Sequence, residues 1–128
     1  MKAHFILYVS DQSRSSAFYR NVLGQEPTLD VDGMTEFILN DGAILGLMPE
    51  TGIRRLLGDA ICDPALGHSI PRAELYLLVD EPQAYYERAL ARGARTLSPL
   101  ERRNWGDLVA YCEDPDGHVL ALAKREIG

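Results

Sequence analysis

Two side chains capable of metal binding and acid–base chemistry, His4 and Glu74, hold equivalent places in two similar stretches of the sequence. His4 stands five residues before Val9, and Glu74 stands five residues before Val79. A histidine and a carboxylate can share a divalent cation, or they can form a hydrogen-bonded pair in which Glu74 serves as a general base. Metal sites normally use three or four protein ligands, so ligand counting favours the hydrogen-bonded pair over a metal site.

The two stretches predict a duplicated β-α-β-β-β module. Residues 4–9 and 74–79 alternate as strands, and Asp11 and Asp80 each stand 13 residues ahead of a glycine that follows a helix. We expect one domain over residues 1–128, with modules at about 1–48 and 72–128. Further strands are predicted at about 26–32, 34–40, 43–48, 95–100, 107–113 and 118–124.

Strand alternation predicts which side chains pack and which line a binding surface. Phe5, Leu7 and Val9 share one face, which we expect to pack, while His4, Ile6 and Tyr8 share the other. The inner faces so defined are largely apolar and aromatic, as in small-molecule sites, although a plain core explains the same residue types. These inner-face residues are Ile6, Tyr8, Ile44, Met48, Tyr76, Leu78, Val119 and Ala123. We predict ligand contacts from Tyr8, Met48, Tyr76, Trp105 and Tyr111.

Local signals fix where helices and turns begin and end. Ser10 or Asp11 can cap the first helix, Gly24 suits its end, and Pro82 suits the first turn of the second helix. Tight turns are predicted at Asp-Gly pairs 32–33 and 41–42 and at residues 114–117. The stretch 49–71 lacks sustained periodicity apart from a short turn at 53–57, which predicts a long connection serving as a lid, a crossover or a partly disordered loop. His68 lies in this connection, where we expect a solvated side chain.

Composition and charge argue against two classes of partner. The chain of 128 residues carries a net charge of −6, which disfavours binding to nucleic acid or to anionic membranes. It contains no apolar run long enough to span a bilayer and no signal-peptide pattern, so we expect a cytoplasmic protein. Cys62 and Cys112 fit no zinc or disulfide spacing, and we predict reduced thiols without a catalytic role.

A series of short motifs in a fixed order resembles the vicinal oxygen chelate superfamily, which includes glyoxalase I, bleomycin-resistance proteins and extradiol dioxygenases. The motifs are His4, Val9-Ser-Asp11, Phe18-Tyr19, Leu23-Gly24 and Asp114-Pro-Asp-Gly-His118. The resemblance covers nearly the whole chain and implies an α+β fold, in which two tandem β-α-β-β-β modules form a cup-shaped mixed sheet. It also implies a homodimer.

The resemblance implies four metal-ligand places, on the first and last strand of each module. In this chain they are held by His4, Gly46, Glu74 and Ala121, of which Gly46 and Ala121 offer no side-chain ligand. The metal enzymes of the family usually carry a glutamate at the place of Ala121. We therefore expect either no cofactor or a weakly bound divalent Zn, Mn or Fe on His4 and Glu74, with Gly46 and Ala121 leaving room beside it.

Three functions follow as hypotheses. The first is a protein that binds a small organic molecule in an aromatic cup without a complete metal site. The second is a metal-dependent lyase, isomerase or dioxygenase, with Glu74 as catalytic residue and a further ligand from Glu36, Tyr111 or Glu113. The third is a dimeric domain without catalysis, whose cup serves a protein or peptide partner.

Overall fold

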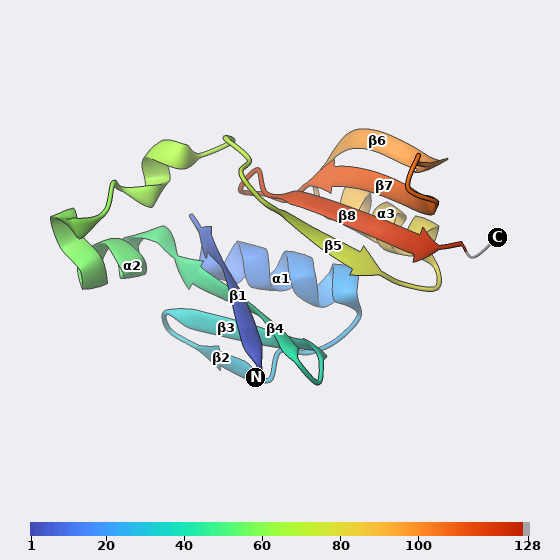
Figure 1. The fold of residues 1–128 in the computed structure, drawn as a ribbon. Helices are drawn as coiled ribbons and strands as arrows, with labels where there is room; N and C mark the ends of the chain where they lie inside the picture. Colours follow the sequence, from blue (N-terminus) through green and yellow to red (C-terminus); the bar gives the residue numbers. More distant parts are fainter. Residues whose placement is uncertain (127–128) are drawn as a thin grey trace. The chain divides into compact units, whose positions relative to one another are not determined.

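The computed structural model describes residues 1–126, and the chain runs through two successive β-α-β-β-β units (Figure 1). By their internal contacts, the first unit comprises residues 1–20 and 24–68, and the second comprises residues 21–23 and 69 onward. Among the described residues, no helix is both long enough and apolar enough to cross a membrane.

The first unit contains a mixed four-stranded sheet. Its elements are β1 (Ala3–Val9), α1 (Gln12–Leu23, of which residues 21–23 group with the second unit), β2 (Leu29–Val31), β3 (Met34–Asn40) and β4 (Ala43–Pro49). The strand order is β1-β4-β3-β2, in which β1 runs parallel to β4 and the other neighbours are antiparallel. The parallel pair requires a crossover, which α1, β2 and β3 supply.

The second unit repeats this topology. Its elements are β5 (Glu74–Leu78), α3 (Pro82–Ala91), β6 (Arg95–Arg102), β7 (Asp107–Glu113) and β8 (Val119–Arg125). The order is β5-β8-β7-β6, with β5 parallel to β8. The predicted fold class of two tandem β-α-β-β-β modules with mixed sheets is confirmed.

Both crossover helices begin and end where the sequence predicts. Asp11 caps α1 by accepting a hydrogen bond from the Arg14 amide at 3.0 Å, and Gly24 follows the helix in the left-handed conformation with φ of 66°. Pro82 opens α3, where its missing amide hydrogen costs no helical bond. These local signals set the ends of the helix in each connection between two parallel strands, α1 between β1 and β4 and α3 between β5 and β8.

The connection between the units is more ordered than predicted. It contains α2 (Glu50–Leu57) and two short 3-10 turns, Gly58–Ala60 and Pro64–Gly67. The apolar residues Ile53, Leu56 and Leu57 of α2 recur at helical spacing, but Gly52 interrupts its first turn, so the sequence predicts only a short turn at 53–57. Glu50 in the first turn and Arg54 and Arg55 in the last turn suit the helix dipole and favour this helix.

The central strands β4 and β8 carry the core of each unit. In each of them four successive residues are buried, Ile44–Leu47 and Leu120–Ala123. Of the three residues expected to pack on β1, Val9 is fully buried, but the prediction for Phe5 is wrong because its side chain is 56% exposed. Strand β1 is the edge of its sheet and pairs on one side only with β4, which leaves Phe5 with less cover than its register partner Leu45.

Candidate functional site

One face of the second sheet gathers aromatic and charged side chains in register. Tyr76 on β5 and Tyr111 on β7 both pair with Ala121 on β8, the strand between them. Two residues further along β8, and so on the same face, Ala123 pairs with both Leu78 and Val109. Val109, Ala121 and Ala123 form a small buried cluster against which both tyrosines pack. We call this surface the Tyr76 face.

A buried carboxylate anchors one end of the Tyr76 face. Asp107, whose side chain is 3% exposed, pairs in register with Arg125. The Arg125 guanidinium donates to the two carboxylate oxygens at 3.2 and 3.4 Å, and the Tyr76 hydroxyl donates to Oδ2 at 2.5 Å. Because β8 lies between β5 and β7, small residues on β8 allow the Tyr76 side chain to reach Asp107.

Trp105 extends this chain of hydrogen bonds. Its indole Nε1 donates to the Tyr76 hydroxyl at 3.0 Å, so the bonds run from Trp105 to Tyr76 and from Tyr76 to Asp107. Trp105 lies in the turn between β6 and β7, which the Gly106 amide closes by donating to the Arg103 carbonyl at 3.0 Å. The indole is oriented by this bond, yet the residue is 55% exposed. Its ring surface is therefore available to a ligand.

The pKa shifts of Asp107 and Tyr76 show which group donates the proton in the hydrogen bond between them. The hydrogen bonds from Arg125 and then from Tyr76 hold the pKa of the Asp107 carboxyl below its usual range. Desolvation, followed by the hydrogen bond to Asp107, raises the pKa of the Tyr76 hydroxyl. Tyr76 is thus a protonated donor at neutral pH and not a base, and Asp107 is an ionised acceptor.

Tyr111 shares the face with a second arginine. The Arg103 guanidinium lies 5.2 Å from the centre of the Tyr111 ring, within cation–π range. Arg103 is held there by hydrogen bonds to the Ser98 hydroxyl and the Val109 carbonyl, both at 2.8 Å. Desolvation and then the charge of Glu74 raise the pKa of Tyr111, while Arg103 opposes that rise.

In the first unit, His4 has a partner on its own sheet. Its Nδ1 lies 3.4 Å from Oε2 of Glu36 on β3, and Glu36 pairs in register with Gly46 on β4. Tyr8 and Met48 pair with each other across β1 and β4. His4 is 41% exposed and Glu36 20% exposed at the side chain, so this contact is half-solvated, and it is an ion pair only when the imidazole is protonated.

The space expected beside Gly46 is filled, which corrects the prediction that Gly46 and Ala121 leave room for an ion. A side chain at Gly46 would place its Cβ 3.1 Å from Cγ1 of Ile6 and 3.3 Å from Sδ of Met34. Ala121 is fully buried and belongs to the cluster that Tyr76 and Tyr111 cover. Apolar side chains and the two tyrosines occupy the places where further ligands would stand.

The family model described as the glyoxalase/bleomycin resistance protein/dioxygenase superfamily matches residues 3–122 of this chain. The chain belongs to this superfamily. Solved structures agree in fold. A glyoxalase-related enzyme from Fulvimarina pelagi is similar over 100% of this chain and 92% of its own, with a TM-score of 0.81 and 25% identity. A superfamily enzyme from Burkholderia phytofirmans PsJN aligns with 96% of this chain and 97% of its own, with a TM-score of 0.80 and 18% identity.

A protein of unknown function from Agrobacterium tumefaciens is similar over 98% of this chain and 95% of its own, with a TM-score of 0.77 and 24% identity. No curated protein matches the sequence significantly. At these identities the solved structures establish the fold, and the residues of this chain must supply the argument for its function.

The donor set in this member of the superfamily does not fit the metal that the fold implies. Gly46 and Ala121 supply no ligand atom, and the Gly46 place is closed by Ile6 and Met34. Within either unit, across residues 1–126, no three His, Cys, Asp or Glu side chains lie close enough together to hold a metal ion. We therefore derive no chemical step through a metal.

The structure brings together three of the predicted ligand-binding residues, Tyr76, Trp105 and Tyr111, on the Tyr76 face. It places Tyr8 and Met48 side by side in the first unit, and Glu74 on the edge strand β5. Sequence reasoning missed Asp107, Arg125 and Arg103 as parts of the site. The first two pair only through the β7–β8 register, which no local motif reveals.

Proposed function

We propose that this protein binds a small, flat and partly apolar organic molecule on the Tyr76 face, without a complete metal site. The observation that supports this most directly is the bonded chain from Trp105 through Tyr76 to Asp107. It orients the exposed Trp105 indole, whose Nε1 already has a hydrogen-bond acceptor, and so leaves the face of the ring for stacking on a ligand.

The neighbouring groups support both an apolar and a polar contact. Leu78, 51% exposed, lies on the same face as Tyr76 and offers apolar area. Arg125 is 63% exposed at its side chain. Its guanidinium carries five N–H donors, and two of them, one on each of two nitrogens, bond to Asp107. The remaining donors suit a carbonyl or carboxylate oxygen on a flat ligand.

Trp105 is the only tryptophan in the sequence, so its fluorescence reports directly on this face. We expect compounds with a flat ring and an acidic oxygen to change Trp105 emission with saturation in a screen of such molecules. Tyr76→Phe removes the acceptor that orients the indole and should weaken every hit by about three- to tenfold, the usual value of one hydrogen bond.

Tyr85→Phe is the matched control, because Tyr85 lies on α3 under the Arg88 guanidinium at 4.4 Å. That control should leave the affinities unchanged. Equal losses in both variants, or emission that no compound alters, would count against the Tyr76 face as the binding site.

The competing function is a metal-dependent lyase, isomerase or dioxygenase, and the His4–Glu36 pair at 3.4 Å is the observation that favours it. Elemental analysis of protein purified without a chelator or histidine tag, compared with His4→Ala, Glu36→Ala and Glu74→Ala, separates the two. We expect no stoichiometric Zn, Mn or Fe in the parent protein. Stoichiometric metal that disappears in these variants would replace the binding proposal with the enzymatic one.

We further propose that the protein is a homodimer. The support is apolar area that remains exposed on the edge strand β1, where Phe5, Ile6 and Tyr8 are 56%, 40% and 38% exposed. Edge strands with exposed apolar side chains are usual sites of association.

A further inference from the structure

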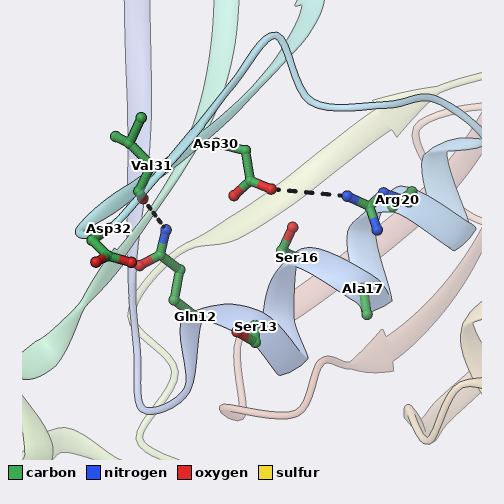
Figure 2. Close-up of a pocket in the computed structure, with 8 residues that line it drawn as sticks. All are labelled: Gln12, Ser13, Ser16, Ala17, Arg20, Asp30, Val31 and Asp32. Carbon is green, nitrogen blue, oxygen red and sulfur yellow. Dashed lines mark hydrogen bonds and ion pairs between the residues drawn. The ribbon is translucent and has the colours of Figure 1, made fainter.

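A polar pocket of about 350 Å³ lies between α1 and the β2–β3 hairpin, wholly within the first unit (Figure 2). Its volume lies at the lower end of the range of small-molecule sites, about 300–1,000 Å³. One stripe of α1, at three- and four-residue spacing, faces two carboxylates of the hairpin. The lining residues that matter are Ser13, Ser16, Ala17, Arg20, Asp30 and Asp32.

The wall of the pocket is fixed by Gln12. Its Nε2 donates to the Val31 carbonyl at 2.7 Å and to the Thr35 hydroxyl at 2.9 Å. Its Oε1 accepts from the Gly33 amide at 2.9 Å. The first residue of α1 is thus tied to three points of the hairpin, and the space between them is formed before any ligand arrives.

Ser16 supplies a hydroxyl to the pocket from an almost fully buried residue. The residue is 6% exposed, and Ser16 Oγ is not among the buried polar atoms left without a hydrogen bond in residues 1–126. Figure 2 shows its hydroxyl rising from α1 on the side where Asp30 lies. A hydroxyl can donate one hydrogen bond and accept two, so the Ser16 hydroxyl suits a polar group of a ligand.

The charge of the pocket is negative. Asp30 accepts from the Thr35 hydroxyl through Oδ1 at 3.0 Å, and its Oδ2 lies 3.9 Å from Arg20, at the limit of an ion pair. Arg20 is engaged more closely by Glu26, at 2.6 Å from its Nε. Asp32, two residues further along the same hairpin, adds a second carboxylate, and the cation beside them, Arg20, is already shared.

We propose that this pocket binds a small organic ammonium that carries hydroxyl groups, the chemical class of amino sugars and amino alcohols. The ammonium group suits the carboxylates of Asp30 and Asp32, and its hydroxyl groups suit the hydroxyls of Ser16 and Ser13. The residues of this pocket differ from those of the Tyr76 face, which belong to the second sheet, so each proposal can be refuted without affecting the other.

Glucosamine and glucose are matched probes, since they share ring hydroxyls and differ in the ammonium group. In a titration followed by two-dimensional amide NMR at low salt, glucosamine should shift the amides of residues 12–20 and 30–35 with saturation. Glucose should bind at least about tenfold more weakly, the ratio expected when a charged hydrogen bond is lost. Equal binding of the two sugars, or shifts confined to residues 74–125, would overturn the proposal.

Variants test the residues one by one. Ser16→Ala should weaken glucosamine binding by about three- to tenfold, and Asp30→Asn and Asp32→Asn by about tenfold or more. Asp32 is exposed, so its replacement leaves the fold intact even if the Asp30 variant is unstable. Asp41→Asn, an exposed carboxylate in the turn between β3 and β4, is the control and should bind as the parent does. Losses in Asp41→Asn as large as those in Asp32→Asn would show a general charge effect and refute the site.

Discussion

Asp107 illustrates how a single buried carboxylate organises a surface made of larger residues. Its two oxygens take bonds from Arg125 and Tyr76, and Tyr76 in turn accepts from Trp105. An ionised group with so little exposure is retained only where such donors satisfy it. The aromatic residues of the Tyr76 face are therefore held in place by charge as well as by packing.

This arrangement predicts a defined pH dependence. The folded-state pKa of Asp107 lies below its unfolded value, which is about 3.9 for aspartate. The stability contributed by Asp107 is therefore present above about pH 4 and lost as the pH falls through the lower folded pKa. Urea unfolding of the parent and of Asp107→Asn from pH 7 to pH 2 should show a stability gap that narrows at the acid end.

The control for this gap is Asp41→Asn, which removes one exposed carboxylate with the same change in net charge. A gap between the parent and Asp107→Asn that is constant across the whole pH range would contradict the assigned role of Asp107.

At alkaline pH the change in stability is set by Tyr76, whose folded pKa lies above its unfolded value of about 10. Stability from Tyr76 is present below about pH 10 and lost as the pH rises through the folded pKa.

The two cysteines are predicted to differ sharply in reactivity. Cys112 is fully buried, and burial followed by the charge of Asp114 raises the pKa of its thiol to about 12, whereas Cys62 is exposed. Because the thiolate is the reactive form, a disulfide reagent at about pH 8 should titrate one thiol in the folded protein and two in urea. Cys62→Ser should leave no fast-reacting thiol, and two fast thiols in the folded parent would contradict the buried position of Cys112.

At the scale of single residues, the sequence predicts which aromatic side chains lie on the Tyr76 face better than which charged side chains do. Tyr76 and its strand alternation follow from a period of two, and the structure places Tyr76, Trp105 and Tyr111 on one surface. The pairing of Asp107 with Arg125 depends on the register between two strands, which is set by the whole sheet. The pairing of His4 with Glu36 likewise depends on the position of β3 relative to β1.

At the scale of elements, the turn at 114–117 is where backbone conformation and close packing meet. Gly117 has φ of 87°, and a Cβ there would lie 2.9 Å from Cα of Ser69, at the end of the connection. The same turn is held by Asp114, whose Oδ1 accepts from the amides of Asp116 and His118, both at 2.9 Å. The turn thus fixes the start of the second unit as well as the junction between β7 and β8.

Gly117→Ala is therefore predicted to destabilise the protein more than a glycine replacement that costs only backbone strain. Gly93→Ala is the matched control, since Gly93 has φ of 97° but no atom within 4 Å of the place that a Cβ would take. We expect a loss of about 1–2 kcal/mol for Gly93→Ala from the left-handed conformation. Gly117→Ala should lose about 1–3 kcal/mol more because backbone atoms must move. Equal losses in thermal or urea unfolding would show that Ser69 does not pack against Gly117.

The order of elements is the part of the structure most fully predicted from the sequence. Both crossover helices are marked by a residue suited to the helix start and by a glycine shortly after the helix, and the hairpins are marked by glycine turns. For helix α2 the sequence predicts only a short turn, because Gly52 stands in the first turn of a helix of only 8 residues. Gly46 shows the opposite error, since a missing side chain in the sequence does not imply an empty space when Ile6 and Met34 lie beside it.

At the scale of the whole molecule, the sequence repeat appears as two units with one topology, each with an edge strand, β1 or β5, paired on one side within its unit. The edge strand β1 carries three exposed apolar residues, Phe5, Ile6 and Tyr8, in a stretch of four. Edges of this kind associate unless charged or covered, and β1 carries no charged residue between Phe5 and Val9. These features support the proposed homodimer.

The dimer predicts a mass near twice 14.2 kDa by light scattering at micromolar concentration. Phe5→Glu places a charge on the exposed edge and should shift the mass toward 14.2 kDa, because burying that carboxylate between two copies is unfavourable. Leu66→Glu is the control, as Leu66 is 78% exposed but lies in the connection outside any strand. It should remain dimeric. A parent mass of 14.2 kDa would refute the dimer, and dissociation by Leu66→Glu rather than Phe5→Glu would move the interface from β1 to the connection.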